Sequence, residues 1–408
     1  MFEKKYLPSL LSLYINYFVH GMGAIILAQN SRFLQAQLGT DNAGISFVIS
    51  ALGIGRLAVL FGSGMLSDKF GRRPFVLLGT VSYLIFFVGI LFAPNVPVAF
   101  ALALVAGAAN SFLDSGCIPA VMEILDKMTG TASVVTKLFM SMGQFTLPMI
   151  ISFLVGNNIY FGYSFIICAA VLALNFLITL KIPFKNVEAA SKKNDDTTEA
   201  VDHNKKQPNF WLEGLALILI GFTCTTTFYL VSQWITTYGR DVVGMEEGAA
   251  QRIMSMYSMG SIIAVLLVAM LVKSLVKPVR VILIFPGLSL IALIVLWAYP
   301  TPFIVNTMAF AIGFTAAGGV LQMTLTTMTN MFSGSKGKIL GFVYTSSSIA
   351  FFVIPVITGV VSKTSVSNVI LFDIFVTAIG VVLAVVVNIR YNQLQKNGTE
   401  GKELYEYS

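Results

Sequence analysis

The chain has 408 residues, of which 56% are hydrophobic and only 11% are charged, and its formal net charge is +7. Charged residues this scarce cannot cover a water-soluble protein of this length, so a soluble enzyme is excluded and lipid is the expected solvent. At roughly 20 apolar residues per bilayer crossing, the length allows about twelve membrane helices with short connections.

Apolar runs predict twelve transmembrane helices, six before and six after a polar gap. Lipid offers no partners to free backbone groups, so each span must be a helix. The first six spans are 7–28, 44–66, 74–93, 98–124, 134–155 and 161–180, and the last six are 210–236, 251–272, 279–298, 303–329, 338–361 and 367–389. The predicted fold class is an all-α membrane protein made of two pseudo-symmetric six-helix bundles.

These spans divide the chain into four parts. Residues 1–180 form the N-terminal bundle and residues 210–390 the C-terminal bundle. The segment 181–209 between them is charged and nearly free of large apolar residues, so we expect a cytoplasmic linker without a fold of its own. Residues 391–408 are expected to form a cytoplasmic tail.

Basic residues are strongly biased to one side of the predicted membrane. Of the 26 Lys and Arg residues, 21 fall at the termini and in the connections on the terminal side, four fall on the opposite side, and Arg56 lies inside a span. This bias predicts that both termini are cytoplasmic. Topology therefore explains the positive charge, and we expect no nucleic-acid partner.

The two halves match when the sequence is laid over itself. Gly55 aligns with Gly260, Pro94 with Pro300, Gly107 with Gly313 and Pro148 with Pro355, at offsets of 205 to 207 residues. Parallel repeats of this kind place a substrate site between the halves near the bilayer midplane, and one half rocks against the other to give alternating access.

The connection after the second span reads GSGMLSDKFGRRP. It closely resembles the signature G-x-L-x-D-(K/R)-x-G-(R/K)-(R/K) of the major facilitator superfamily, a family of solute transporters with two six-helix halves. The resemblance implies a cluster that latches the cytoplasmic side in the outward-facing state. The candidate latch residues are Gly64, Asp68, Gly71, Arg72, Arg73 and, as an acidic partner for Arg72, Glu123. The alternative is positive-inside charge around a tight turn, which explains the arginines but not the glycine and aspartate pattern.

Three further segments, HGMGAIILAQN, TDNAGISFVISALGIGRL and NSFLDSG, look like a narrower branch of bacterial inner-membrane permeases. Members of that branch often accompany shikimate or quinate metabolism. The resemblance implies a multi-pass protein of the bacterial cytoplasmic membrane, and we expect it to be a monomer.

Three strongly polar side chains lie deep within the apolar spans. With a helical rise of about 1.5 Å per residue, His20, Arg56 and Asp114 are each predicted to lie roughly 15 to 20 Å from the cytoplasmic boundary of the membrane. This depth is close to the bilayer midplane. Ionisable residues at this depth are costly and are treated as functional. His20 is a candidate for substrate contact, with a proton relay or helix packing as alternatives.

Polar residues spaced by four predict a lined cavity, because this spacing places them on one helix face. The stripes are Asn16 and His20; Asn110 and Asp114; Thr225, Tyr229 and Gln233; and Gly318, Gln322 and Thr326, with Gln144 at similar depth. The alternative for each single residue is an interhelical bond or a hydroxyl bonded to its own backbone. The candidate substrate-binding residues are His20, Arg56, Asn110, Gln144, Tyr229, Gln233, Gln322 and Thr326.

Arg56 always carries its charge, so in the bilayer it requires an acidic neighbour or an anionic substrate. Asp114 is the candidate neighbour. One hypothesis is that a substrate carboxylate and Asp114 compete for Arg56, so that Asp114 takes up a proton and couples proton to solute movement. The alternative is a permanent structural ion pair. Asp373 and Glu213 lie near helix starts, and no role is assigned to them from the sequence.

The sequence favours a secondary transporter, most simply a proton-coupled importer of a small polar organic acid that resembles shikimate or quinate. Ser346 to Ser348 offer bonds to a hydroxylated ring. An exporter is the first alternative, although MSMGQFTLPMI in the fifth span lacks the glycine before proline that is usual in exporters. A membrane sensor without turnover is the second. We expect no metal site, nucleotide loop or cofactor, because neither a His/Cys cluster nor a phosphate-binding glycine run occurs.

Overall fold

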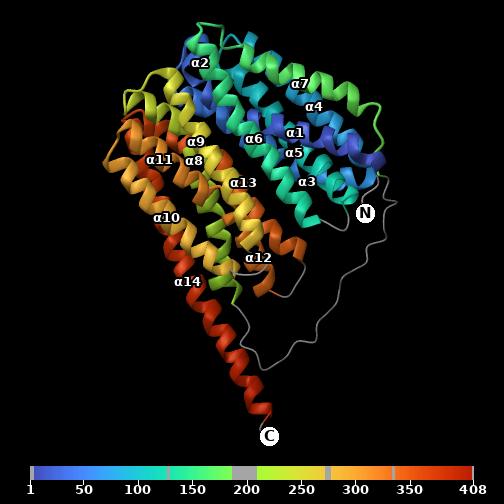
Figure 1. Cartoon of the computed structure of the whole chain (residues 1–408), viewed down its shortest axis with the longest axis vertical. Helices are drawn as coiled ribbons and strands as arrows, with labels where there is room; N and C mark the ends of the chain where they lie inside the picture. The colour runs from blue at the N-terminus through green and yellow to red at the C-terminus, as the bar shows by residue number, and fades with distance from the viewer. Residues whose placement is uncertain (1–3, 126–128, 186–208, 272–276, 333–335, 407–408) are drawn as a thin grey trace.

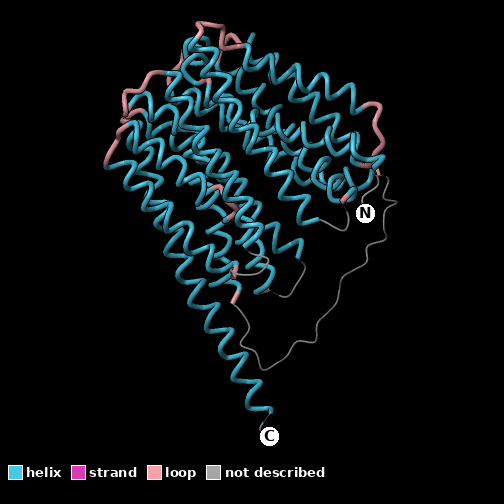
Figure 2. The backbone as a smooth tube through the Cα atoms, viewed as in Figure 1, coloured by secondary structure: helices cyan, strands magenta, loops and turns pink. Residues whose placement is uncertain are grey.

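The computed structural model describes residues 4–125, 129–185, 209–271, 277–332 and 336–406. Within these ranges the chain consists of helices and short connections (Figure 2). The helices of the N-terminal half are α1 (Leu7–Gln29), α2 (Ser31–Leu38), α3 (Asn42–Phe70), α4 (Arg72–Gly89), α5 (Val96–Ile124), α6 (Thr129–Gly156) and α7 (Tyr163–Thr179). Those of the C-terminal half are α8 (Leu215–Asp241), α9 (Glu247–Leu271), α10 (Pro278–Ala298), α11 (Pro302–Ala316), α12 (Val320–Met331), α13 (Lys336–Ser362) and α14 (Val366–Glu406).

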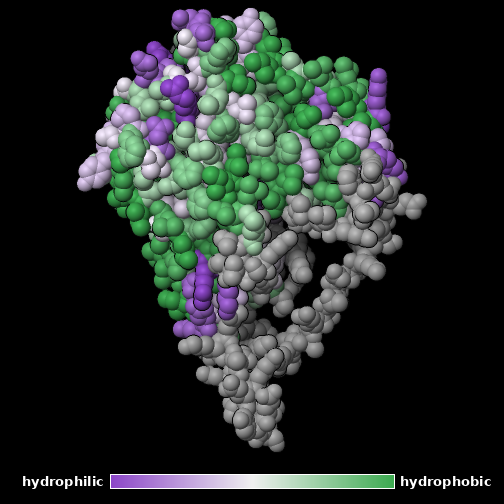
Figure 3. All heavy atoms as spheres, viewed as in Figure 1, coloured by the Kyte–Doolittle hydropathy of each residue, from purple (hydrophilic) through white to green (hydrophobic). Residues whose placement is uncertain are grey.

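The described helices are long and apolar enough to cross a bilayer. Eleven segments meet that requirement by length and composition, and Tyr163–Thr179 is a shorter apolar helix. Apolar residues cover the middle of the visible surface, and hydrophilic residues gather toward its ends (Figure 3). The predicted all-α membrane fold class is therefore confirmed.

The helices form two groups that lie side by side (Figure 1). Across the halves, α6 packs against α9 and α3 packs against α13. The two groups approach each other at the end that carries α2 and diverge toward the end that carries both termini. The central cavity described below lies between them.

The tenth predicted span, 303–329, is not one continuous helix. It is divided into α11 and α12 by a break at Ala317, Gly318 and Gly319. Gly319 has φ of +113°, which only glycine adopts without strain. The regular spacing of side chains along α11 therefore does not continue into α12.

Glycine pairs explain the close helix crossings that repeat in the two halves. A Cβ on Gly55 would lie 2.1 Å from the Leu104 carbonyl oxygen, and one on Gly107 would lie 2.3 Å from the Leu52 carbonyl oxygen. The aligned positions behave in the same way, because a Cβ on Gly260 would lie 2.1 Å from the Phe310 oxygen and one on Gly313 would lie 1.9 Å from the Tyr257 oxygen. The α3–α5 crossing of one half is thus repeated as the α9–α11 crossing of the other.

Replacing Gly107 by Ala is expected to destabilise the protein by about 1–3 kcal/mol, because the new methyl group meets backbone that cannot rotate away. Gly62→Ala is the matched control: a Cβ at Gly62 meets nothing within 4 Å, and the change is expected to be neutral or slightly stabilising. Thermal unfolding of the two purified variants, followed by tryptophan fluorescence, measures the difference. Equal melting temperatures would contradict the proposed packing role of Gly107.

A partly buried ion pair joins the π-helical turn Phe210–Gly214, just before α8, to α14. The Glu213 side chain is fully buried, and its Oε1 accepts a bond from Arg390 Nε at 2.8 Å. Its other oxygen accepts the backbone N–H of Asn209 at 2.8 Å. Glu213, which had no assigned role from the sequence, thus ties together two ends of the C-terminal half.

Candidate functional site: a central cavity

A cavity containing about 490 Å³ of atom-free space lies between the two halves. Its walls come from α1, α3, α5 and α6 on one side and from α8 and α13 on the other. Six predicted binding residues from these helices line it: His20, Arg56, Asn110, Gln144, Tyr229 and Gln233. Residues separated by more than 200 positions in the sequence are therefore brought to one chamber.

Arg56 stands at the wall of this cavity and is paired with Asp114. Arg56 Nη2 lies 2.9 Å from Asp114 Oδ2, and the Tyr17 hydroxyl donates to Asp114 Oδ1 at 2.7 Å. Arg56 lines the cavity, whereas Asp114 is not among its lining residues. Arg56 Nε has no hydrogen-bond partner, and the guanidinium lies over the Phe351 ring at 5.2 Å. The guanidinium can therefore still receive an anion in the cavity.

The remaining wall of the N-terminal half is aromatic and polar. The His20 ring stacks on Tyr17 with centroids 5.3 Å apart, and His20 Nδ1 has no partner. The Tyr83 hydroxyl donates to Asn110 Oδ1. Gln144 of α6 completes this wall. The unpartnered imidazole nitrogen is a polar group that a ligand could satisfy.

The C-terminal half contributes Tyr229 and Gln233, one helical turn apart on α8. The Tyr229 ring meets Phe351 edge-on at 4.6 Å. Gln233 Nε2 donates across the halves to the Ala24 carbonyl at 3.2 Å, and its own carbonyl oxygen has no partner. A flat ring inserted here would meet aromatic faces and free polar atoms.

Some predicted residues are not brought to this cavity. Gln322 is exposed on α12, and the Thr326 hydroxyl donates to the Gln322 carbonyl at 2.8 Å. The break before α12 ends the helical register on which their placement depended. The hydroxyls of Ser346 and Ser347 donate to the carbonyls of Ile218 and Gly221, so they join α13 to α8.

Three residues near the cavity were not found from the sequence. Tyr17 holds Asp114 and Phe351 covers Arg56, as described above. Lys137, which was counted among the cytoplasmic bases, lies half-buried within α6. It shares a helix face with Met140 and Gln144 by its spacing, and both of these line the cavity. That spacing was the available signal for Lys137.

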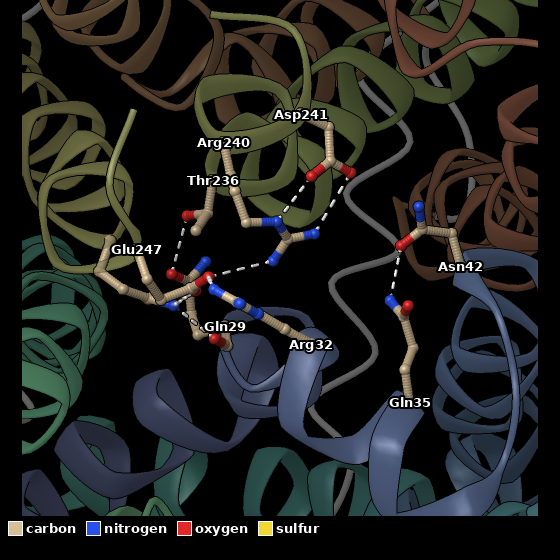
Figure 4. Close-up of polar contacts among 9 residues, drawn as sticks. Gln29, Arg32, Gln35, Asn42, Thr236, Arg240, Asp241 and Glu247 are labelled. Atoms are coloured by element: carbon tan, nitrogen blue, oxygen red, sulfur yellow. Dashed lines mark hydrogen bonds and ion pairs between the residues drawn. The ribbon is translucent and has the colours of Figure 1, made fainter. Parts of the chain in front are cut away.

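Polar side chains close the end of the molecule opposite to the termini. We call this group the extracellular clamp, and its members are Gln29, Arg32, Thr236, Arg240, Glu247 and Gln251. Figure 4 shows Gln29 and Arg32 of one half pointing toward Thr236, Arg240 and Glu247 of the other. Arg32 Nη1 lies 3.3 Å from Glu247 Oε2, and the Thr236 hydroxyl donates to Gln29 Oε1 at 2.9 Å. Gln251 Nε2 donates to the Gln29 carbonyl at 2.6 Å. Each of these three bonds connects the N-terminal to the C-terminal half.

Within the described residues, Arg72 and Arg73 of the cytoplasmic signature form their hydrogen bonds inside the N-terminal half. Arg72 bonds to Asp68 at 2.5 Å and to Glu123 at 2.8 Å, and Arg73 donates to the Leu180 carbonyl. Gly71 has φ of +86° between α3 and α4, a backbone conformation that favours glycine. The candidate latch residue Gly64 has open space around its α-carbon.

The comparison with protein families agrees with this geometry. Residues 13–336 match the model of the Major Facilitator Superfamily. The chain belongs to this superfamily. Superfamily membership and the fold together identify it as a transporter and not an enzyme.

Curated relatives of this superfamily cover almost the whole chain. The inner membrane transport protein YdiM of Escherichia coli strain K12 is 41% identical over 393 residues, which cover 95% of each protein. The inner membrane transport protein YdiN of the same strain is 38% identical, covering 96% of this chain and 92% of the relative. The uncharacterized MFS-type transporter YfkL of Bacillus subtilis strain 168 is 39% identical, covering 94% and 96%. This superfamily member is accordingly a multi-pass protein of the inner membrane.

Solved structures of the superfamily share the fold at low sequence identity. A D-xylose-proton symporter superposes with a TM-score of 0.75 at 14% identity, covering 94% of this chain and 97% of the other. The nucleoside transporter NupG superposes with a TM-score of 0.71 at 16% identity, covering 94% and 99%. These neighbours support the two-bundle architecture of the major facilitator fold.

Proposed function

We propose that the protein takes up a small hydroxylated organic acid, of the shikimate or quinate type, together with protons. The observation that carries this proposal is the Arg56–Asp114 ion pair at the wall of the central cavity. An arginine that faces a cavity within the bilayer is a natural partner for a carboxylate, because guanidinium binds carboxylates with two parallel bonds. The aromatic rings and free amide oxygen nearby suit a hydroxylated ring.

Coupling follows from competition for one guanidinium. When a substrate carboxylate takes the bonds of Arg56, Asp114 loses its cation and keeps only the bond from Tyr17. A partly buried carboxylate without its counter-ion is costly, so it binds a proton. Substrate and proton are then carried together, and release of both restores the ion pair.

The two gates support alternating access. The extracellular clamp joins the halves, while Arg72 and Arg73 of the cytoplasmic signature bond within one half among the described residues. This arrangement corresponds to an inward-facing conformation. In the outward-facing conformation the clamp opens, and the cytoplasmic signature, with Asp68 and Arg72, engages the opposite half as a latch. The side chain of Asp68 is 72% exposed, so its carboxylate can exchange Arg72 for a partner in the opposite half.

Binding of shikimate and quinate to the purified protein tests the anion site. We expect both acids to raise the melting temperature of the wild type, because ligands that bind the native state stabilise it. Arg56→Gln is expected to weaken binding by about 2 kcal/mol, or roughly thirtyfold in Kd, because charged bonds are lost. Arg56→Lys is the matched control, because it keeps the positive charge but loses the planar guanidinium with its two parallel donors. Its Kd is expected to lie between those of the wild type and Arg56→Gln.

The methyl ester of shikimate separates charge recognition from ring recognition. The ester lacks the negative charge of the acid. It is therefore expected to raise the melting temperature only slightly, and by the same amount in the wild type and in Arg56→Gln. Stabilisation of the wild type by lipophilic cations, with no response to either acid, would overturn the proposal in favour of drug efflux.

A further inference from the structure

A second carboxyl lies fully buried in the C-terminal half, away from the cavity of Arg56. Asp373 follows the start of α14 by seven residues, and its relative exposure is 0%. Its Oδ2 has no hydrogen-bond partner. None of the ion pairs formed among the described residues includes Asp373. A bare carboxylate in such a place costs several kcal/mol.

Two threonines connect Asp373 to the backbone of α8. Asp373 Oδ1 and Thr377 Oγ1 are 3.4 Å apart, Thr377 Oγ1 and Thr227 Oγ1 are 2.6 Å apart, and Thr227 Oγ1 lies 3.2 Å from the Thr223 carbonyl oxygen. The carbonyl oxygen of Thr223 can only accept a hydrogen bond. These three contacts form a continuous chain from the carboxyl to α8.

With an ionised Asp373, one of the three contacts of this chain lacks a hydrogen. Each of the three contacts needs one hydrogen, and two hydroxyls provide two. If Thr227 donates to the Thr223 carbonyl and Thr377 donates to Thr227, the contact with Asp373 has no hydrogen unless the carboxyl carries it. A neutral carboxyl that donates to Thr377 satisfies all three contacts and removes the buried charge.

A separate cavity adjoins this chain. It contains about 310 Å³ of atom-free space, and both Thr227 and Thr377 line it. Ala316 and Val320, on either side of the break between α11 and α12, also line it. Of the titratable groups on the surrounding helices, Cys224 of α8 lines the cavity, and Tyr257 of α9 donates its hydroxyl to the Phe228 carbonyl. Neither supplies a positive charge to Asp373.

We propose that Asp373 is a second proton-binding site, protonated in this conformation, and that its proton exchanges through Thr377 and the cavity beside the α11–α12 break. A metal cation fits the site less well. Hard cations take about six oxygen ligands, whereas the site offers one carboxyl and two hydroxyls that are already engaged. The inference is independent of the role proposed for Asp114.

Infrared difference spectroscopy of the purified protein tests this assignment with the proton itself as the probe. The wild type is expected to show a protonated-carboxyl band at neutral pH, and this band is expected to be lost completely in Asp373→Asn, which preserves shape and neutrality. Thr377→Val removes the hydroxyl that is bonded to Asp373 Oδ1, so the band should move to higher frequency without disappearing. Transfer to D2O and a rise to alkaline pH should shift and then abolish the band.

The Asp114→Asn background separates this site from the proposed coupling site, since the band is expected to remain there. A wild-type spectrum identical to that of Asp373→Asn would overturn the proposal, as would a band that neither exchanges in D2O nor responds to pH. Loss of the band when sodium chloride replaces choline chloride at constant pH would overturn it in favour of a metal cation.

Discussion

Replacing Asp114 by Asn is expected to abolish proton-driven uptake while leaving substrate exchange intact. Asparagine cannot bind and release a proton, but its carbonyl oxygen can still accept the bond that the Tyr17 hydroxyl gives to Asp114 at 2.7 Å. Arg56 then remains in place for the substrate. Accumulation of labelled shikimate in proteoliposomes with an inward proton gradient should fall to a ratio of about one, because a carrier without a coupled ion only equilibrates its substrate.

Counterflow of labelled against unlabelled shikimate in the same vesicles provides the internal control, and it should continue at the wild-type rate. Asp114→Glu retains a titratable group and is expected to retain part of the driven accumulation. If Asp114→Asn accumulates shikimate as the wild type does, Asp114 has no coupling role and its pairing with Arg56 is structural.

Replacing Glu247 by Gln is expected to shift the protein toward the outward-facing conformation. The Glu247 carboxylate is buried and receives Arg32 from the opposite half at 3.3 Å. Removing its charge weakens the extracellular clamp only where the clamp is closed, so the conformational equilibrium should change by about 1–3 kcal/mol, or roughly five- to 150-fold. Tyr160, between α6 and α7, and Tyr299, between α10 and α11, are exposed on opposite halves. Spin labels at these two positions report the opening as a longer electron–electron distance.

Asp241→Asn is the matched control for Glu247→Gln. Asp241 bonds to Arg240 at 2.6 Å within the same half, so the control removes a neighbouring carboxylate without breaking a contact between halves. Its distance distribution is expected to match that of the wild type. A distribution for Glu247→Gln that also matches the wild type would show that the carboxylate does not hold the gate closed.

Much of the architecture was predictable because lipid restricts the possible structures. Each span must be a helix, and the repeat offset brings Gly55 and Gly107 into correspondence with Gly260 and Gly313, which the structure places at equivalent crossings. The break in the tenth span was not predicted. Adjacent small residues in an apolar run indicate close packing as readily as a break, and φ at Gly319 depends on tertiary context.

The candidate site was predictable where periodicity carries spatial information. The four-residue spacing of Tyr229 and Gln233 predicted that they share one helix face, and both line the cavity. The similar predicted depths of Arg56 and Asp114 in the membrane indicated that they could meet, and they form an ion pair. No comparable spacing or depth in the sequence predicts the extracellular clamp. Arg32 and Glu247 lie near helix ends, where charged residues are common, and only the closed arrangement of the halves makes them neighbours.

The partly buried pair of Glu213 and Arg390 has a practical consequence for handling this protein. A purification tag or fluorescent fusion belongs after the end of α14, where it leaves the pair undisturbed. Truncation before Arg390 would instead strand a carboxylate inside the C-terminal bundle, so the shortened chain should express poorly even though no predicted membrane span is removed.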